Sequence, residues 1–141
     1  MGRKIDDIAE VAVAVVCSSS SGALVGTAVS LVGYGRARFV FTFGMLVAPG
    51  SLASAGIWEC ATSNGTFTSK PLAQLTAASS GLISDAVAVI DVGVNPDKPW
   101  LKVSGALSGS MVNHSVTVTK YNGTRLVKAS TALAEETVSV Y

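Results

Sequence analysis

The chain is poor in the residues that most often carry enzyme chemistry. It has one histidine, His114, and two cysteines, Cys17 and Cys60, among 141 residues. A lone histidine with no second nitrogen or thiolate ligand at a usable spacing argues against a metal site. The Gly-x-Ser-x-Gly segment that presents the nucleophile of many serine hydrolases is also missing. We therefore expect a protein that is not an enzyme, with no catalytic residue, no metal and no cofactor.

Charged residues are also scarce. Charged residues make up 13% of the chain, hydrophobic residues 49%, and the formal net charge is +1. A monomer with so few charges has difficulty keeping its surface free of apolar patches, so we expect much of the surface to be buried against copies of itself or a larger body. A charge near zero gives no electrostatic steering toward phosphates. We therefore expect no nucleic acid partner.

Long hydrophobic runs are missing as well. The longest, Val11 to Cys17, has seven residues, whereas a transmembrane helix needs about 20. Asp6, Asp7 and Glu10 precede this run, where a signal peptide has positive charge. The sequence thus predicts no membrane partner and a chain made in the cytoplasm without processing. Free thiols are favoured for both cysteines, and a disulfide within or between subunits remains open.

What the chain does have is a series of short alternating apolar and polar segments separated by turn residues. This pattern predicts about eight short strands and no long helix. The expected fold is all-β, an antiparallel β-sandwich or a jelly-roll-like barrel. The predicted strands cover residues 10–17, 27–33, 38–43, 56–61, 66–68, 86–92, 100–104 and 112–121.

The chain is expected to form one β domain, residues 1–141. Residues 1–9 are predicted to be an N-terminal arm, 10–123 the β core, and 124–141 a C-terminal arm or edge strand. Turn residues predict a loop over 18–22, a connection over 45–54 with Pro49-Gly50 as its turn, and a hairpin at Asn64-Gly65. The segment 72–80 fits either a loop or a short helix.

Alternation assigns roles within the strongest strand. Phe39, Phe41 and Phe43 share one face and are predicted to lie in the core, because side chains of a strand alternate between its faces. Arg38 lies on the other face of this strand, and Arg36 comes just before the strand begins. They are interpreted as solvated edge charges that discourage strand pairing, with contact to a partner's carboxylates as the alternative.

The carboxylates are interpreted as structural. Asp85, Asp91 and Asp97 could form a carboxylate cluster, but a catalytic pair needs a defined separation in space that the sequence cannot supply. Asp91 interrupts an apolar strand and is expected to cap it or to pair with Lys102 across the sheet. Asp97 follows a proline and is expected in a turn. His114 is interpreted as a turn histidine.

Three segments resemble a known family. VSLVGYGRARFVFTF at 29–43, the Trp58 strand with its Asn-Gly-Thr-Phe-Thr turn at 57–68, and KPWLKVS at 98–104 are similar to segments of tailed-bacteriophage virion proteins. Together they span about 29–121. The resemblance implies a capsid decoration (cement) or minor head protein, non-enzymatic and oligomeric on the shell, that binds the major capsid protein and is localised on the virion.

The leading hypothesis is therefore a structural protein that stabilises a bacteriophage capsid as a homo-oligomer, with a trimer favoured. A second hypothesis is a carbohydrate-binding sandwich of a phage tail or host-recognition module. Its candidate stacking residues are Trp58, Trp100, Tyr34 and Tyr121. A third hypothesis, a hydrolase that uses His114, has the least support. Exposure of the two tryptophans discriminates the second hypothesis from the first.

Overall fold

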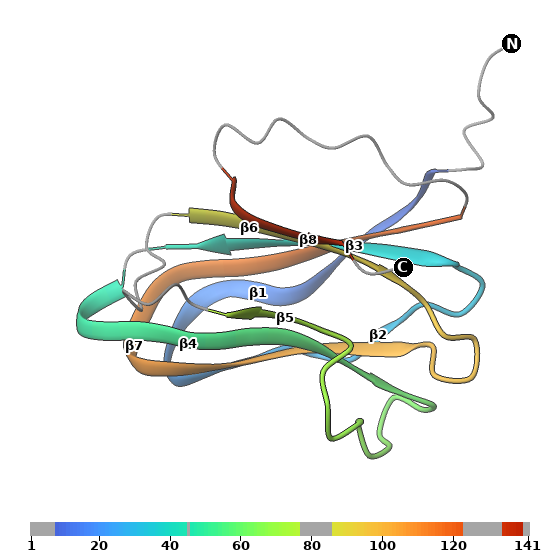
Figure 1. Ribbon diagram of the computed structural model, residues 1–141, viewed down its shortest axis with the longest axis horizontal. Coiled ribbons are helices and arrows are strands. Elements are labelled where there is room, and N and C mark those ends of the chain that lie inside the picture. The colour runs from blue at the N-terminus through green and yellow to red at the C-terminus, as the bar shows by residue number, and fades with distance from the viewer. Residues whose placement is uncertain (1–7, 45, 77–85, 123–133, 140–141) are drawn as a thin grey trace, which may run out of the picture.

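The computed structural model describes residues 8–44, 46–76, 86–122 and 134–139, and within these ranges it is all-β (Figure 1). No helix long and apolar enough to cross a membrane is found in the described segments. The eight strands are β1 (Ile8–Val25), β2 (Val29–Ser30), β3 (Arg36–Phe43), β4 (Leu46–Cys60), β5 (Ala73–Thr76), β6 (Ala86–Gly93), β7 (Trp100–Tyr121) and β8 (Ala134–Ser139).

The strands form a β-sandwich of two layers, which confirms the predicted fold class (Figure 1). Both layers contain part of the longest strand, β7. The N-terminal half of β7 pairs with β4, which pairs with β5. The C-terminal half of β7 pairs with β3, followed by β6 and β8. β1 runs antiparallel along β7 in both layers, with Val13 opposite Thr117 and Leu24 opposite Gly105. The two layers are therefore held together by strands that bend from one into the other.

The core lies between the layers and follows the predicted alternation. Phe39 and Phe41 are 0% exposed and Phe43 is 2% exposed, which confirms the phenylalanine stripe as core. The rings of Phe41 and Phe43 stack with centroids 5.8 Å apart. Opposite Phe39 and Phe41, the inward side chains of β6 and β7 are β-branched or small, which suits a close-packed sheet interface.

Three strands are longer than predicted. β1 continues through the expected loop at 18–22, and β7 joins the two strands predicted at 100–104 and 112–121. Through these segments of small residues, β1 and β7 remain paired as antiparallel strands, with Ser21 opposite Ser110. β4 also includes Pro49-Gly50, which lies at a register shift between Val47 and Ser51. A bulge thus accommodates the proline that was predicted to turn the chain.

Other local predictions also need correction. Turn residues do surround Asn64-Gly65, but 66–68 is not a strand, and the strand that returns beside β4 is β5. The ambiguous segment 72–80 contains β5, and its residues 77–80 lie outside the described part. β8 pairs with β6 in parallel, so the sheet is not wholly antiparallel.

Candidate functional site

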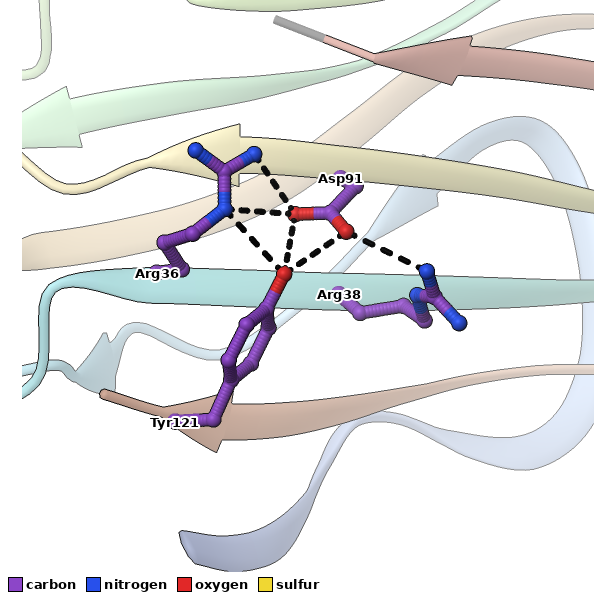
Figure 2. Close-up of polar contacts among 4 residues, drawn as sticks. All are labelled: Arg36, Arg38, Asp91 and Tyr121. Carbon is purple, nitrogen blue, oxygen red and sulfur yellow. Dashed lines mark hydrogen bonds and ion pairs between the residues drawn. The ribbon is translucent and has the colours of Figure 1, made fainter. Parts of the chain in front are cut away.

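Four polar side chains meet on the outer face of the β7–β3–β6 layer (Figure 2). Asp91 lies opposite Arg38, and Arg36 lies opposite Tyr121, so neighbouring strands bring the four together. Arg36 Nη2 and Arg38 Nη2 lie 3.0 and 3.3 Å from the two carboxylate oxygens of Asp91. The Tyr121 hydroxyl lies 2.7 and 2.8 Å from the same oxygens. We call this group the Arg–Asp–Tyr cluster.

The charges of the cluster are paired with one another around a buried carboxylate. Asp91 and Tyr121 are each 1% exposed, and a buried carboxylate is tolerated where it is paired and hydrogen-bonded. Burial lowers the pKa of Arg36, but hydrogen bonds to Tyr121 and Asp91 and the charge of Asp91 outweigh it, so the pKa is raised from its ordinary value. The arginine therefore stays protonated, and the carboxylate that it contacts is buried.

This arrangement corrects two predictions. Asp91 does not pair with Lys102, because Lys102 lies in the half of β7 that belongs to the other layer. Arg36 and Arg38 are not edge charges either. β3 is an internal strand between β7 and β6, and both arginines bind Asp91.

Beside the cluster, the described outward-facing side chains of β1, β7, β3 and β6 include an uncharged row. One cross-strand row runs from β1 to β6 through Val13, Thr117, Val40 and Val89. We define the Val/Thr face as this row together with its outward-facing neighbours Val11 and Thr42. Val11 is 67% exposed and Val13 is 53% exposed. Among the described residues of β1, β3, β6 and the C-terminal half of β7, charge is confined to the Arg–Asp–Tyr cluster and to Lys120, which pairs with the exposed Glu10 at 3.3 Å.

Such a face is unusual for a layer that meets water. An antiparallel sheet with one solvated face alternates apolar-in and polar-out, whereas a strand buried on both faces is apolar at nearly every position. β6 has the second pattern, Ala-Val-Ala-Val-Ile-Asp-Val-Gly, although the core covers only one of its faces. The outward-facing valines therefore favour a partner on this side of the sandwich.

The edge of the sandwich formed by β1 also favours a partner. In the described part of the chain β1 pairs only with β7, so it forms an edge along both layers. Three of the exposed large hydrophobic residues lie on it, Val11, Val13 and Val25. Several register shifts interrupt the β1–β7 ladder, and bulges of this kind restrain uncontrolled pairing at an edge. An edge of this length is suited to association between chains.

Those remaining candidate residues that the structure describes lie on different elements of the fold. His114 is 2% exposed within β7, so it is not a turn histidine. Asp97 lies exposed in the Asn95–Lys98 turn, as predicted, and Asp85 lies outside the described residues. Cys60 has a free, buried thiol that lies 3.2 Å from the carbonyl oxygen of Thr66. Over the described ranges no three His, Cys, Asp or Glu side chains gather where they could hold a metal ion.

The four aromatic residues predicted as stacking surfaces separate into different environments. Tyr121 is buried in the cluster and cannot stack on a ligand. Tyr34 is half-buried, with Lys120 Nζ 5.7 Å from the centre of its ring. Trp58 and Trp100 are half-buried on the outer face of the β4–β7 layer, opposite the Val/Thr face. Of the four, Tyr121 is thus excluded, whereas Tyr34, Trp58 and Trp100 keep part of their surface exposed.

Comparison with protein-family models and with curated proteins finds no match for this chain. A functional assignment therefore depends on the faces, edge and clusters described above and on the resemblance of its segments.

Proposed function

We propose that the protein is a non-enzymatic structural module that binds a bacteriophage capsid through the Val/Thr face. The uncharged row Val13, Thr117, Val40 and Val89 is the observation that carries the proposal. A flat β-branched surface loses little side-chain entropy when it is covered, and covering it removes apolar area from water. The identity of the partner as the major capsid protein rests on the resemblance of residues 29–121 to virion decoration proteins.

The proposed mechanism is stabilisation of the assembled shell by mass action. A protein that binds the assembled shell but not its separate subunits shifts the equilibrium toward the shell. The Arg–Asp–Tyr cluster fixes the register of β7, β3 and β6 beneath the docking surface. A pre-organised surface binds with less ordering cost than a flexible one. The localisation proposed is the outer surface of the virion.

Self-association through β1 is the second part of the proposal. An edge strand with exposed valines can add to the edge of another copy through main-chain hydrogen bonds. We expect a homo-oligomer, with a trimer favoured. Light scattering on the pure protein measures its mass directly, with and without reductant. A protein that remains monomeric with and without reductant would contradict this part of the proposal.

The capsid experiment compares two single charges on opposite faces. Thr117→Lys places a charge in the centre of the Val/Thr face, and Gln74→Lys places one on the exposed outer side of β5. Both sites are exposed, so we expect both variants to fold. Wild type and Gln74→Lys should co-sediment with heads that lack the protein, and Thr117→Lys should not. Wild type that stays in the supernatant, or equal binding of both variants, would count against the proposal.

A further inference from the structure

The outer face of the β4–β7 layer contains a small pocket that the proposed docking does not use. Its cavity volume is about 210 Å³, and Trp58, Phe67, Lys102 and Ser104 line it. Trp58 and Lys102 lie opposite each other on neighbouring strands, and Phe67 comes from the segment that follows β4. Drug-sized ligands occupy roughly 300–1,000 Å³, so this pocket has room for a single small ring.

Trp58 lies down on the sheet because its neighbour on the strand has no side chain. A Cβ atom on Gly56 would lie 3.0 and 3.1 Å from ring atoms Cζ3 and Cη2 of Trp58. The indole therefore covers the position that a side chain would otherwise occupy, and Trp58 keeps part of its surface exposed. A ring laid on a sheet in this way offers its free face to a flat ligand. The electron-rich face of indole attracts the weakly positive C–H groups of a sugar ring.

The charge in the pocket is positive and unbalanced by the residues that line it. Lys102 Nζ lies 5.7 Å from the centre of the Phe67 ring, a cation–π arrangement. None of the four lining residues is acidic, and the one acid of β4, Glu59, pairs with Lys98 at 3.7 Å. Lys102 can therefore bind an incoming carboxylate without first breaking an ion pair among the described residues. Ser104 adds a hydroxyl that donates or accepts a hydrogen bond.

From this geometry we infer that the pocket binds a pyranose that carries a carboxylate. The sugar ring stacks on Trp58 against the wall formed by Phe67, its carboxylate contacts Lys102, and a ring hydroxyl bonds to Ser104. This inference does not rest on docking to a capsid. The pocket and the Val/Thr face belong to the outer faces of different layers, on opposite sides of the sandwich (Figure 1). A protein bound through the Val/Thr face would keep the pocket open to solvent.

The test uses two probes that differ in one group, methyl β-D-glucuronide and methyl β-D-glucoside. Binding is followed by tryptophan fluorescence in a Trp100→Phe variant, in which Trp58 is the one remaining tryptophan. We expect saturable binding in the millimolar range and roughly tenfold tighter binding of the glucuronide, because charge-assisted hydrogen bonds exceed neutral ones. No saturable change with either probe, or equal affinity for both, would overturn the inference.

Two substitutions at Lys102 separate charge from packing. Lys102→Met keeps an unbranched side chain of similar length and should lower glucuronide affinity to that of the glucoside. Lys102→Arg should restore the preference, since it restores the positive charge. Nuclear magnetic resonance spectra of each variant establish that the fold is retained. A Lys102→Met protein that still prefers the glucuronide would refute the assigned role of the lysine.

Trp58→Ala tests the stacking surface, with ligand-observed magnetic resonance as the readout because the fluorophore is removed. It should abolish binding of both sugars, whereas Trp100→Phe should bind as wild type does. A glutamate-rich peptide is the competing ligand. Binding of that peptide to Lys102 in the absence of any glucuronide binding would assign the pocket to protein and reject a sugar.

Discussion

Replacement of Asp91 by asparagine tests how much the Arg–Asp–Tyr cluster stabilises the sandwich. The substitution keeps the shape of the side chain and removes the charge that Arg36 and Arg38 contact. Removing one partner of a buried ion pair costs about 3–5 kcal/mol. Because the arginine side chains are 16% and 11% exposed, water can recover part of this loss. We therefore expect a loss near the lower end, about 3 kcal/mol.

Thermal unfolding followed by circular dichroism measures this loss. A chain of this length changes its midpoint by about 4 °C for each kcal/mol, so Asp91→Asn should lower it by roughly 12 °C. The difference should persist in about 0.5 M salt, because buried pairs are screened weakly. Asp97→Asn is the matched control in an exposed turn, and we expect a change within about 0.5 kcal/mol. A midpoint within about 3 °C of wild type for Asp91→Asn would refute the reasoning.

Two further predictions concern close packing around β4. Gly105→Ala should destabilise the fold by about 1–3 kcal/mol in urea titrations, because the new Cβ would lie 2.6 Å from the backbone oxygen of Ser54. Gly35→Ala, whose nearest contact is at 3.6 Å, should have little effect, and equal losses would contradict this account. In a Cys17→Ser background, the buried Cys60 thiol should react with a thiol reagent in urea and resist it in native buffer; rapid native reaction would show that Cys60 is accessible.

The core residues and the fold class were predicted correctly from the alternation of side chains along single strands. The Phe39, Phe41 and Phe43 stripe is core because period-two patterning is a local property that survives without knowledge of neighbours. The sandwich architecture follows from the same patterns and their spacing. The turn residues at Asn95–Lys98 were likewise recognisable, since proline and asparagine act on their own backbone.

The local pattern did not predict that two of the strands continue through segments rich in serine and glycine. Serine and glycine over 18–22 and 105–111 are typical of loops, yet they lie in β1 and β7 where the two strands bend between layers. Tertiary pairing overrides local propensity at such positions. Pro49 was misread for a related reason, because a register shift in β4 absorbs it.

The partners of Asp91 were also hidden, since they depend on register between strands far apart in sequence. Nothing near Asp91 in the chain signals that Arg38 lies beside it, or that Tyr121 reaches the same carboxylate. One signal was nevertheless available. An aspartate within a strongly apolar strand needs a cation as its partner. Arg36 and Arg38 are two of the ten cations in the chain, and they alternate with apolar residues at the start of β3.

The two outer faces differ in the kind of partner they can recognise. The Val/Thr face is broad and uncharged, and its recognition of a partner depends on shape and on the area covered. The pocket at Trp58 is narrow and carries one cation, Lys102, so its recognition depends on a single ring and a single charge. Because the layers place these surfaces back to back, occupation of one leaves the other accessible. A sandwich with this division can attach to a large body and still present a small-ligand site outward.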